Sequence, residues 1–580
     1  MTPNTAATPL VEVRDLGISF GEVRAVDGVS FTLQPGGALG VVGESGSGKS
    51  ASAYALLGLH RGTGAQVTGT VRVAGVDVGS ATDAELRALR GGSAAMVFQD
   101  PLSSLDPYYA IGDQIAEVYR VHKGGSRRAA RARAVSVLDR VGIPDAARRS
   151  RSRPHEFSGG MRQRALIAMA LACEPRLLIA DEPTTALDVT VQAQILDLLH
   201  ELRHETGLGL LLVTHDVGVA AESVEEVLVM RAGREVERGP VETVLTAPRE
   251  LYTRALLAAV PQLSPAGASP RAPLAPEGRS SSIAGRAENA HADRHRVVRG
   301  AGNCATSHAR SEADHTAPGG EPVIEALGVS RAFGRGRAAF RAVDDVTLTL
   351  HPGQTLGIVG ESGSGKTTLG RMLVGLLEPT AGHVTRTGSV QMVFQDPVAS
   401  LNPRRSIGES VADPLRAAGE RDQARIRSRV AELLTRVGLD PDRHDSYPHE
   451  FSGGQRQRVG IARALAAEPR LIVCDEPVSA LDVTTQAHVI SLLAELQREL
   501  GLALVFVAHD LAVVRQVSHR VAVMRRGRIV EEGEVGVVYG APKDPYTRQL
   551  LAAVPSLDPA QAAARRAARR APLREGLPVA

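Results

Sequence analysis

Two stretches of nearly identical sequence carry the residue types that bind phosphate groups: VVGESGSGKS at 41–50 and IVGESGSGKT at 358–367. Each fits the spacing G-x-x-x-x-G-K-[ST], with an apolar run before it and a helix-competent segment after it, which is the context of a phosphate-binding loop. Glycines let the backbone curl so that successive N–H groups point at phosphate oxygens, and the following helix start adds positive dipole. A glycine-rich turn without a ligand is the plain alternative, but two copies in matched context argue against it.

The lysine of each copy is expected to reach the β- and γ-phosphates, and the Ser or Thr hydroxyl to help hold Mg²⁺. The chain has 67 basic residues, of which only four are lysines, and two of those four lie in these loops. A compact ammonium fits between phosphate oxygens where a planar guanidinium does not. The residues assigned to the two loops are Gly43, Gly46, Gly48, Lys49 and Ser50, and Gly360, Gly363, Gly365, Lys366 and Thr367.

Pairs of acidic residues follow two apolar runs, LLIADE ending in Asp181–Glu182 and LIVCDE ending in Asp475–Glu476. A strand that ends in carboxylates places them at the sheet edge where α/β proteins bind ligands. The first acid is expected to hold magnesium through water, and the second to orient and polarise an attacking water. Such a pair is common as a helix cap, so its weight comes from the phosphate loops upstream.

A third repeated element, FSGGM at 157–161 and FSGGQ at 451–455, resembles a phosphate loop without a lysine. Its serine can cap the following helix, and its two glycines allow a close approach to an anion. A simple helix cap does not explain why this sequence recurs at a fixed distance before the acid pair. We therefore expect Ser158 and Ser452 to contact phosphate.

The whole chain is organised as a repeat, with matching residues 294 positions apart from Ser158 and Ser452 onward. Upstream, the first copy has 21 additional residues between its loop lysine and Gln99. These include the alternating run VTGTVRVAGVDV at 67–78, which predicts an antiparallel hairpin that the second copy has trimmed. Apolar runs at 38–42, 177–180 and 210–214, separated by helical stretches, predict an α/β fold with a mostly parallel sheet.

Composition sets limits on the class of protein. The chain has 580 residues, 43% hydrophobic and 23% charged, and a net charge of +3, which does not indicate a nucleic-acid partner. Its three cysteines, Cys173, Cys304 and Cys474, fit neither a disulfide framework nor a metal site. Neither a signal peptide nor a run of about 18 apolar residues is visible.

The repeat predicts four segments. These are domains at 9–263 and 322–558, a disordered linker rich in Pro, Gly, Ser and Ala at 264–321, and a basic flexible tail at 559–580. Histidines and Cys304 in the linker are expected to be scattered solvated side chains rather than a metal site.

Together these motifs resemble the ATP-binding domains of ABC transporters, and the resemblance covers nearly all of both halves. The family fold it implies is a tandem of P-loop NTPase domains, each with a mostly parallel core sheet, an antiparallel β subdomain and a helical subdomain. The family implies a head-to-tail pair in which each ATP lies between the phosphate loop of one half and the serine-glycine-glycine signature of the other.

The resemblance assigns a role to each matching residue. Phe20 and Phe333 stack on adenine, with Phe333 set farther from its loop; Glu182 and Glu476 are catalytic; His215 and His509 hold the γ-phosphate; Asp188 and Asp482 communicate across the interface. One ATP site comprises Phe20, Gly43, Ser45, Gly46, Gly48, Lys49, Ser50, Gln99, Asp181, Glu182 and His215 with Ser452 and Gly454. The other comprises Phe333, Gly360, Ser362, Gly363, Gly365, Lys366, Thr367, Gln395, Asp475, Glu476 and His509 with Ser158 and Gly160. The residues assigned to Mg²⁺ are Ser50, Gln99, Asp181, Thr367, Gln395 and Asp475. Met161 departs from the family's glutamine, and its effect is expected to be mild.

Within this family, FQDPLSSLDP at 98–107, FQDPVASLNP at 394–403 and the two YTR…LLAAVP segments are similar to ATPases of oligopeptide, dipeptide and nickel importers. That likeness implies two separate integral-membrane permeases, an extracytoplasmic substrate-binding protein and a peripheral position on the cytoplasmic face of the membrane. Some members bind an iron–sulfur cluster after this tail, but no cysteine cluster follows it here, so none is expected.

One alternative from another class is a soluble twin-cassette ATPase that acts on ribosomes or DNA. Its ribosomal members are expected to carry a charged helical connector, whereas 264–321 is rich in Pro and Ser. The cargo stays open among peptides, glutathione, nickel chelates and opines, since specificity resides in the permeases and the binding protein.

Overall fold

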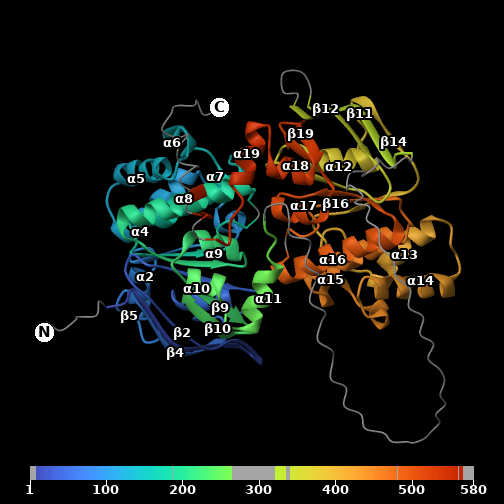
Figure 1. The fold of residues 1–580 in the computed structure, drawn as a ribbon. Helices are drawn as coiled ribbons and strands as arrows, with labels where there is room; N and C mark the ends of the chain where they lie inside the picture. The colour runs from blue at the N-terminus through green and yellow to red at the C-terminus, as the bar shows by residue number, and fades with distance from the viewer. Residues whose placement is uncertain are drawn as a thin grey trace, which may run out of the picture.

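Two halves of similar architecture lie side by side in this computed structural model, the first coloured blue to green and the second yellow to red (Figure 1). The predicted duplication of an α/β unit is confirmed. Most of the predicted linker at 264–321 and of the predicted tail at 559–580 lies outside the described residues. The structure describes residues 8–185, 187–263, 321–334, 340–479, 481–558, 561–562 and 564–565.

The central sheet of the first half has six strands in the order β10-β9-β3-β8-β7-β6, parallel except for β10 at one edge. The predicted strands at 38–42, 177–180 and 210–214 are confirmed as β3, β7 and β8, which are buried along their whole length. Continuous apolar runs are typical of parallel strands covered on both faces. The strand bounds are β3 Ala38–Gly43, β6 Ala94–Val97, β7 Leu177–Asp181, β8 Gly209–Thr214, β9 Glu226–Arg231 and β10 Arg234–Pro240.

The second half repeats this sheet in the order β15-β16-β17-β13-β18-β19, again with one antiparallel edge strand. In both halves the phosphate loop follows the carboxyl end of one strand, and the acid pair follows the carboxyl end of another strand close to it in the same sheet. The loop and the acid pair therefore lie at one edge of the sheet. The bounds are β13 Thr355–Val359, β15 Val390–Val393, β16 Leu471–Asp475, β17 Ala503–Val507, β18 Arg520–Arg525 and β19 Arg528–Glu534.

A separate antiparallel sheet packs beside each central sheet. In the first half its order is β2-β1-β4-β5, and the predicted hairpin at 67–78 is confirmed by β4 pairing with β5. The second half has β12-β11-β14, so it keeps the counterpart of β4 but, among its described residues, has none of β5 or of helix α2 (Asp83–Leu89). The bounds are β1 Val11–Phe20, β2 Val23–Leu33, β4 Ala65–Val73, β5 Val76–Asp77, β11 Ile324–Phe333, β12 Phe340–Leu350 and β14 Ala381–Arg386.

Helices flank the sheets and form a helical subdomain in each half (Figure 1). No helix in the described part of the chain combines the length and apolar character needed to cross a membrane. First-half bounds are α1 Lys49–Ala55, α3 Pro101–Ser104, α4 Ile111–Lys123, α5 Arg127–Arg140, α6 Ala146–Arg149, α7 Gly159–Leu171, α8 Val189–Thr206, α9 Val217–Ser223, α10 Val241–Thr246 and α11 Leu251–Ala259. Second-half bounds are α12 Lys366–Val374, α13 Ile407–Ala417, α14 Gln423–Arg436, α15 Gly453–Leu465, α16 Val483–Leu500, α17 Leu511–Val517, α18 Val535–Gly540 and α19 Pro545–Ala552.

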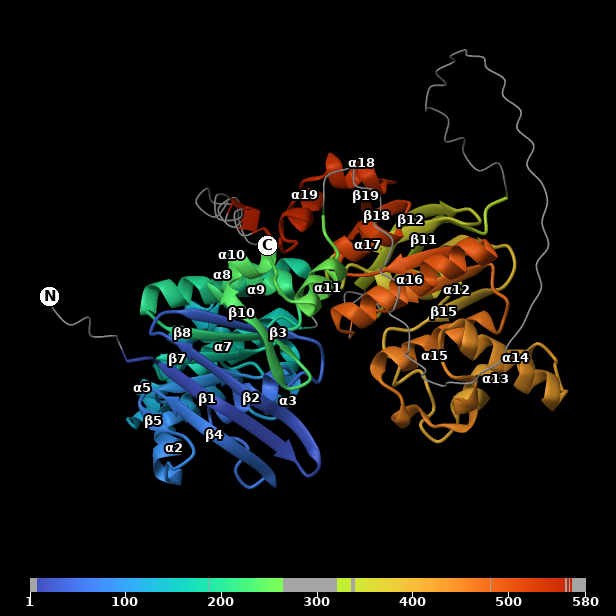
Figure 2. The same ribbon diagram turned by 60° about the horizontal axis from the view of Figure 1, so that its bottom comes forward.

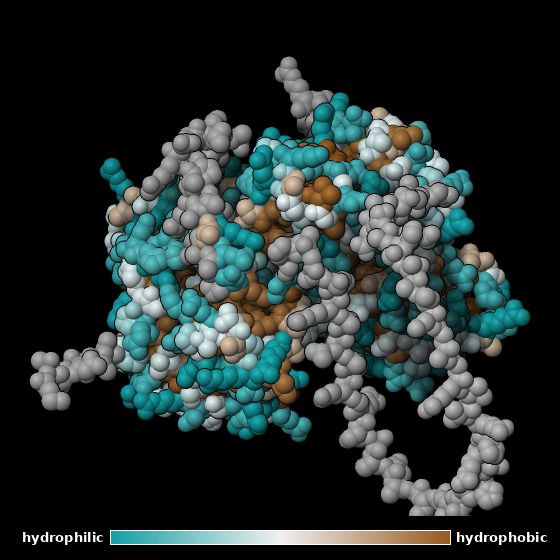
Figure 3. Space-filling view, in the orientation of Figure 1, coloured by the Kyte–Doolittle hydropathy of each residue, from teal (hydrophilic) through white to brown (hydrophobic). Residues whose placement is uncertain are grey.

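The C-terminal segment of each half packs against the opposite half. Helix α11 packs against α16, and α19 packs against α8, as both ribbon views show (Figures 1 and 2). Leu263 packs on the core of the second half, and Leu557 on the core of the first. The Ser556 amide donates a hydrogen bond to Glu222 at 3.3 Å. Apolar side chains gather along this junction in the space-filling view (Figure 3), so burial of apolar surface joins the halves.

Candidate active site

The lysine of the phosphate loop between β3 and α1 donates hydrogen bonds to the backbone of its own loop. Lys49 Nζ donates to the carbonyl oxygens of Gly43 and Glu44, both at 2.8 Å. Gly48 has a φ of 95°, and a Cβ there would collide with the Ala25 carbonyl, so only glycine fits. In the second half Lys366 Nζ donates to Gly360 at 2.7 Å and to Glu361 at 2.9 Å. Both loops therefore have the same preformed shape.

Each loop lysine lies near an aspartate of the opposite half. Burial lowers the pKa of Lys49 and Lys366, and nearby carboxylates oppose that shift. These carboxylates include Asp482 for Lys49 and Asp188 for Lys366. Asp188 and Asp482 are the N-caps of α8 and α16, which places the start of each of these helices close to the other half's loop.

The hydroxyl that ends each loop meets the first acid of the pair. Ser50 Oγ donates to Asp181 Oδ1, and Thr367 Oγ1 donates to Asp475 Oδ1, both at 3.0 Å. Asp181 is fully buried, and burial raises its pKa. Its second oxygen, Oδ2, is buried without a hydrogen-bond partner among the described residues. A hydroxyl beside a buried, under-coordinated carboxylate suits an oxygen-seeking cation such as Mg²⁺.

The second acid of each pair is held by a glutamine and a histidine. Glu182 accepts hydrogen bonds from Gln99 Nε2 and from Thr185 Oγ1, both at 2.9 Å, and His215 Nδ1 lies 3.1 Å from its carboxylate. In the second half the Glu476 carboxylate lies 2.8 Å from Gln395 Nε2 and 3.4 Å from His509 Nδ1. The structure thus brings the predicted glutamine, glutamate and histidine together twice.

The second acid of each pair has a strained backbone conformation. Glu182 has a φ of 47° and Glu476 a φ of 45°, which is the left-handed region that non-glycine residues rarely occupy. Strain of this kind persists only where the surrounding structure enforces it, and it concentrates at functional sites.

The electrostatics of the acid and the histidine are coupled. Burial alone would raise the pKa of Glu182, but the hydrogen bond and charge of His215 outweigh it and lower that pKa. Burial alone would lower the pKa of His215, but Glu182 raises it. The same directions hold for Glu476 and His509. Each pair therefore favours imidazolium beside carboxylate.

The two predicted adenine-stacking residues occupy equivalent places. Phe20 ends β1 and Phe333 ends β11, with 41% and 42% of each residue exposed. The wider spacing before the second loop falls between β11 and β12, since these strands pair as β1 and β2 do. Arg331 lies over the Phe333 ring at 5.1 Å, whereas Phe20 meets His60 edge-on at 5.6 Å. Both rings are accessible for stacking.

The predicted signature serines cap helices within their own halves. Ser158 Oγ accepts from the Met161 amide and Ser452 Oγ from the Gln455 amide, both at 3.3 Å. Gln455 also accepts from the Ser452 amide at 3.0 Å, a reciprocal bond that Met161 cannot make. Both serines are exposed, and these hydrogen bonds stay within their own half, so the structure does not bring the serines onto the opposite phosphate loop.

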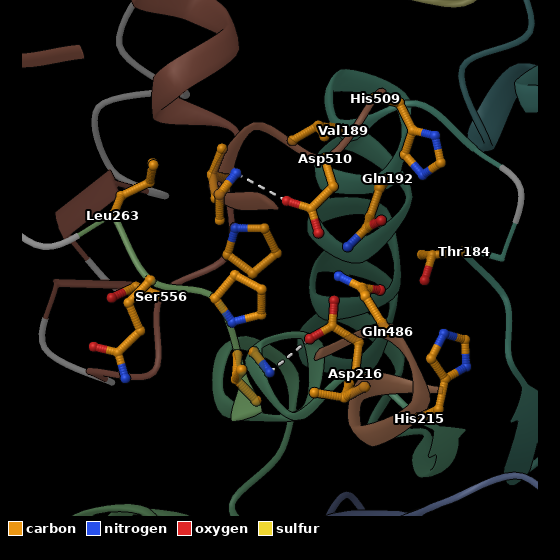
Figure 4. Close-up of a pocket in the computed structure, with 18 of the residues that line it drawn as sticks. Thr184, Val189, Gln192, His215, Asp216, Leu263, Gln486, His509, Asp510 and Ser556 are labelled. Carbon is orange, nitrogen blue, oxygen red and sulfur yellow. Dashed lines mark hydrogen bonds between the residues drawn. The ribbon is translucent and has the colours of Figure 1, made fainter. Parts of the chain in front are cut away.

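A cavity of about 270 Å³ lies on the seam between the halves (Figure 4). His215, Asp216, His509 and Asp510 line it, together with other residues from both halves. Gln192 and Gln486 point toward one another across the seam (Figure 4). The two aspartates cap α9 and α17, which gives each carboxylate backbone hydrogen-bond partners.

Comparison with models of protein families identifies the family of this chain. The model for the ABC transporter family matches residues 26–185 and 343–479. The chain belongs to the ABC transporter family. A second model, for the C-terminal region of oligopeptide/dipeptide transporters, matches residues 236–282 and 530–579. The predicted family, its subgroup and the tandem layout are confirmed, and the chain is an ABC-type ATPase with two ATP-binding cassettes.

Relatives of this ABC protein match it over nearly its full length. The glutathione import ATP-binding protein GsiA of Salmonella typhimurium is 44% identical over 590 residues, covering 96% of this chain and 91% of that protein. GsiA of Escherichia coli O6:H1 is 44% identical over 588 residues, with the same coverage of 96% and 91%. The oligopeptide transport ATP-binding protein OppD of Mycobacterium bovis is 44% identical over 617 residues, covering 96% of this chain and 100% of that protein.

Sequence reasoning missed several residues at the two cassettes. Thr484, just after the Asp482 cap, places its hydroxyl 2.9 Å from the Glu44 carboxylate in the first phosphate loop. Tyr546 accepts a hydrogen bond from the Glu361 amide of the second loop at 3.0 Å. The recurrence of the YTR segment was the signal available for the tyrosine. No local pattern marks Thr484, whose partner is 440 residues away.

The His–Glu contacts predict a pH-dependent stability of the nucleotide-free protein. Because the folded-state pKa of His215 and His509 is raised above 6.5, their contribution is complete below that value and is lost as the pH rises through the folded pKa. We expect the melting temperature of the H215Q/H509Q variant to approach that of the unmodified chain as the pH rises from 6 to 9. Thermal melts across this range test it, with H488Q, an exposed histidine, as control. A difference that is constant with pH would contradict the assignment.

Proposed function

We propose that this chain is the ATP-hydrolysing subunit that powers import of peptides or related small solutes through separate permease subunits. The observation that supports it most is the oligopeptide/dipeptide C-terminal region, matched once after each cassette. Full-length relatives named for glutathione import and oligopeptide transport point to the same cargo class. The proposal includes two integral-membrane permeases, an extracytoplasmic binding protein and a peripheral place on the cytoplasmic face of the membrane.

The proposed domains are those of the sequence prediction, with cassettes at 9–263 and 322–558, a linker at 264–321 and a tail at 559–580. Each ATP would lie between the phosphate loop of one cassette and the signature of the other. The approach of Asp482 to Lys49 and of Asp188 to Lys366 supports this head-to-tail arrangement, since each loop lysine already faces the opposite half.

Within each site, the loop lysine and inward-facing amides would bind the phosphates. Mg²⁺ would be held in the first site by Ser50, Asp181 and Gln99, and in the second by Thr367, Asp475 and Gln395, and when bound it neutralises phosphate charge. Glu182, kept ionised by His215, would accept a proton from the attacking water, and Glu476 would do so in the second site.

Replacing both catalytic glutamates tests these roles. We expect E182Q/E476Q to lower the turnover number for ATP by about 10²- to 10⁴-fold, because glutamine cannot accept the proton, while the Kd for ATP changes by less than about twofold. Steady-state hydrolysis and equilibrium ATP binding measure the two effects. E174Q is a matched control, since Glu174 is exposed and forms a surface ion pair with Arg133. Ordinary turnover in the double variant would contradict the assignment.

Transport itself is tested by reconstitution with the proposed permease subunits. We expect the ATPase to co-purify with them and to drive ATP-dependent uptake of labelled glutathione or a short peptide into proteoliposomes, and E182Q/E476Q to abolish uptake. Sedimentation with ribosomes and no association with the permeases would overturn the proposal in favour of a soluble twin-cassette protein.

A further inference from the structure

Each cassette ends in an extension that returns to its own phosphate loop. In the second half, Tyr546 on α19 is 2% exposed, and its ring lies beneath the Arg525 guanidinium at 4.7 Å. Its hydroxyl accepts a hydrogen bond from the amide of Glu361, the residue after the first loop glycine, at 3.0 Å. A buried hydroxyl therefore fixes the backbone at the entrance of the phosphate loop.

The helix that carries this tyrosine is itself firmly placed. Glu531 on β19 accepts hydrogen bonds from the amides of Lys543 at 2.8 Å and Asp544 at 3.1 Å. Asp544 then caps α19 by accepting from the Tyr546 amide at 2.7 Å. The extension is thus tied to an edge strand of its own sheet, and a shift of the tyrosine would break this chain of hydrogen bonds.

The same helix contacts the opposite cassette. Helix α19 packs against α8, which begins after its cap Asp188. The negative charge of Asp188 favours the protonated forms of both Tyr546 and Lys366, so it acts to raise the pKa of each. Tyr546 therefore lies where the loop of its own cassette meets the start of a helix from the other one.

The first cassette repeats this arrangement with a difference. Tyr252 lies beneath Arg231 at 4.7 Å and beside Glu44, but the contact of its hydroxyl with the Glu44 amide falls short of a hydrogen bond. Instead, the Thr484 hydroxyl of the second cassette lies 2.9 Å from the Glu44 carboxylate and 2.7 Å from Asp482, so the two carboxylates share its proton. The first loop is held from the opposite cassette, and the second is held from its own extension.

We propose, on the basis of the proposed function above, that Tyr546 is a positioning residue for the second ATP site. Its hydroxyl holds the Glu361 amide so that the phosphate loop is in register with α8 of the opposite cassette. Phenylalanine at this position keeps the ring and the contact with Arg525 but leaves the buried amide without its acceptor. The loop then orders only when nucleotide binds, and ATP affinity at that site falls.

Equilibrium ATP binding in the full-length E182Q/E476Q protein tests this inference, because hydrolysis is then removed from the measurement. We expect Y546F to weaken one of the two ATP sites by about 3- to 10-fold, the range for loss of one hydrogen bond, and to leave the other site unchanged. Y252F, whose hydroxyl makes no such bond, is expected to change both sites by less than about twofold.

Y539F supplies a matched control in the same extension. Tyr539 is a half-buried tyrosine, and its hydroxyl donates to the Leu511 carbonyl of α17 at 2.8 Å rather than accepting from a phosphate-loop amide. We expect Y539F to lower the melting temperature and leave both ATP affinities unchanged. Equal affinities in Y546F and its parent, or the same weakening in Y539F, would overturn the role of Tyr546. Failure of the parent protein to bind ATP at all would instead refute the proposed function.

Discussion

The structure depends on the buried lysine ammonium of each phosphate loop, whose positive charge is only partly compensated within its own cassette. Lys49 and Lys366 are each 5% exposed, and each donates to two carbonyl oxygens of its own loop. Burying a charge is costly unless it is paired. The loop, the strand-end acids and an aspartate from the opposite half supply the compensation together. In the proposed head-to-tail arrangement, each loop lysine would gain its remaining compensation from a phosphate ligand and from the other cassette.

The two C-terminal segments, which cross to the opposite halves, hold the two cassettes together at one place. Leu263 and Leu557 each pack on the core of the opposite half, on the same side of the molecule as the seam cavity. The exposed signature serines make no such contact. An arrangement joined at one side and free at the other can close over nucleotide by a hinge motion.

Much of the fold and of the site follows from local sequence. The buried apolar runs of β3, β7 and β8 and the hairpin at 67–78 are visible because strand periodicity and turn residues act over short distances. Lys49, Asp181 and Glu182 could likewise be found from spacing, since a loop and a strand end fix their positions. The roles of Thr484 and Tyr546 could not, although the YTR repeat marks the tyrosine, because these roles come from packing between segments 440 and 185 residues apart. Nor could the strand β14, the counterpart of β4, which the described part of the second half keeps without a counterpart of β5 or α2.

Site-directed cross-linking tests the composite sites most directly. Cysteines placed at Ser158 and Ser362, in a chain with E182Q/E476Q and its native cysteines replaced by alanine, report contact between one signature and the other loop. We expect an intramolecular cross-link that a short bifunctional reagent forms with ATP and Mg²⁺ and forms far less without them. Cross-linking that is absent with ATP, or equal in its absence, would contradict it.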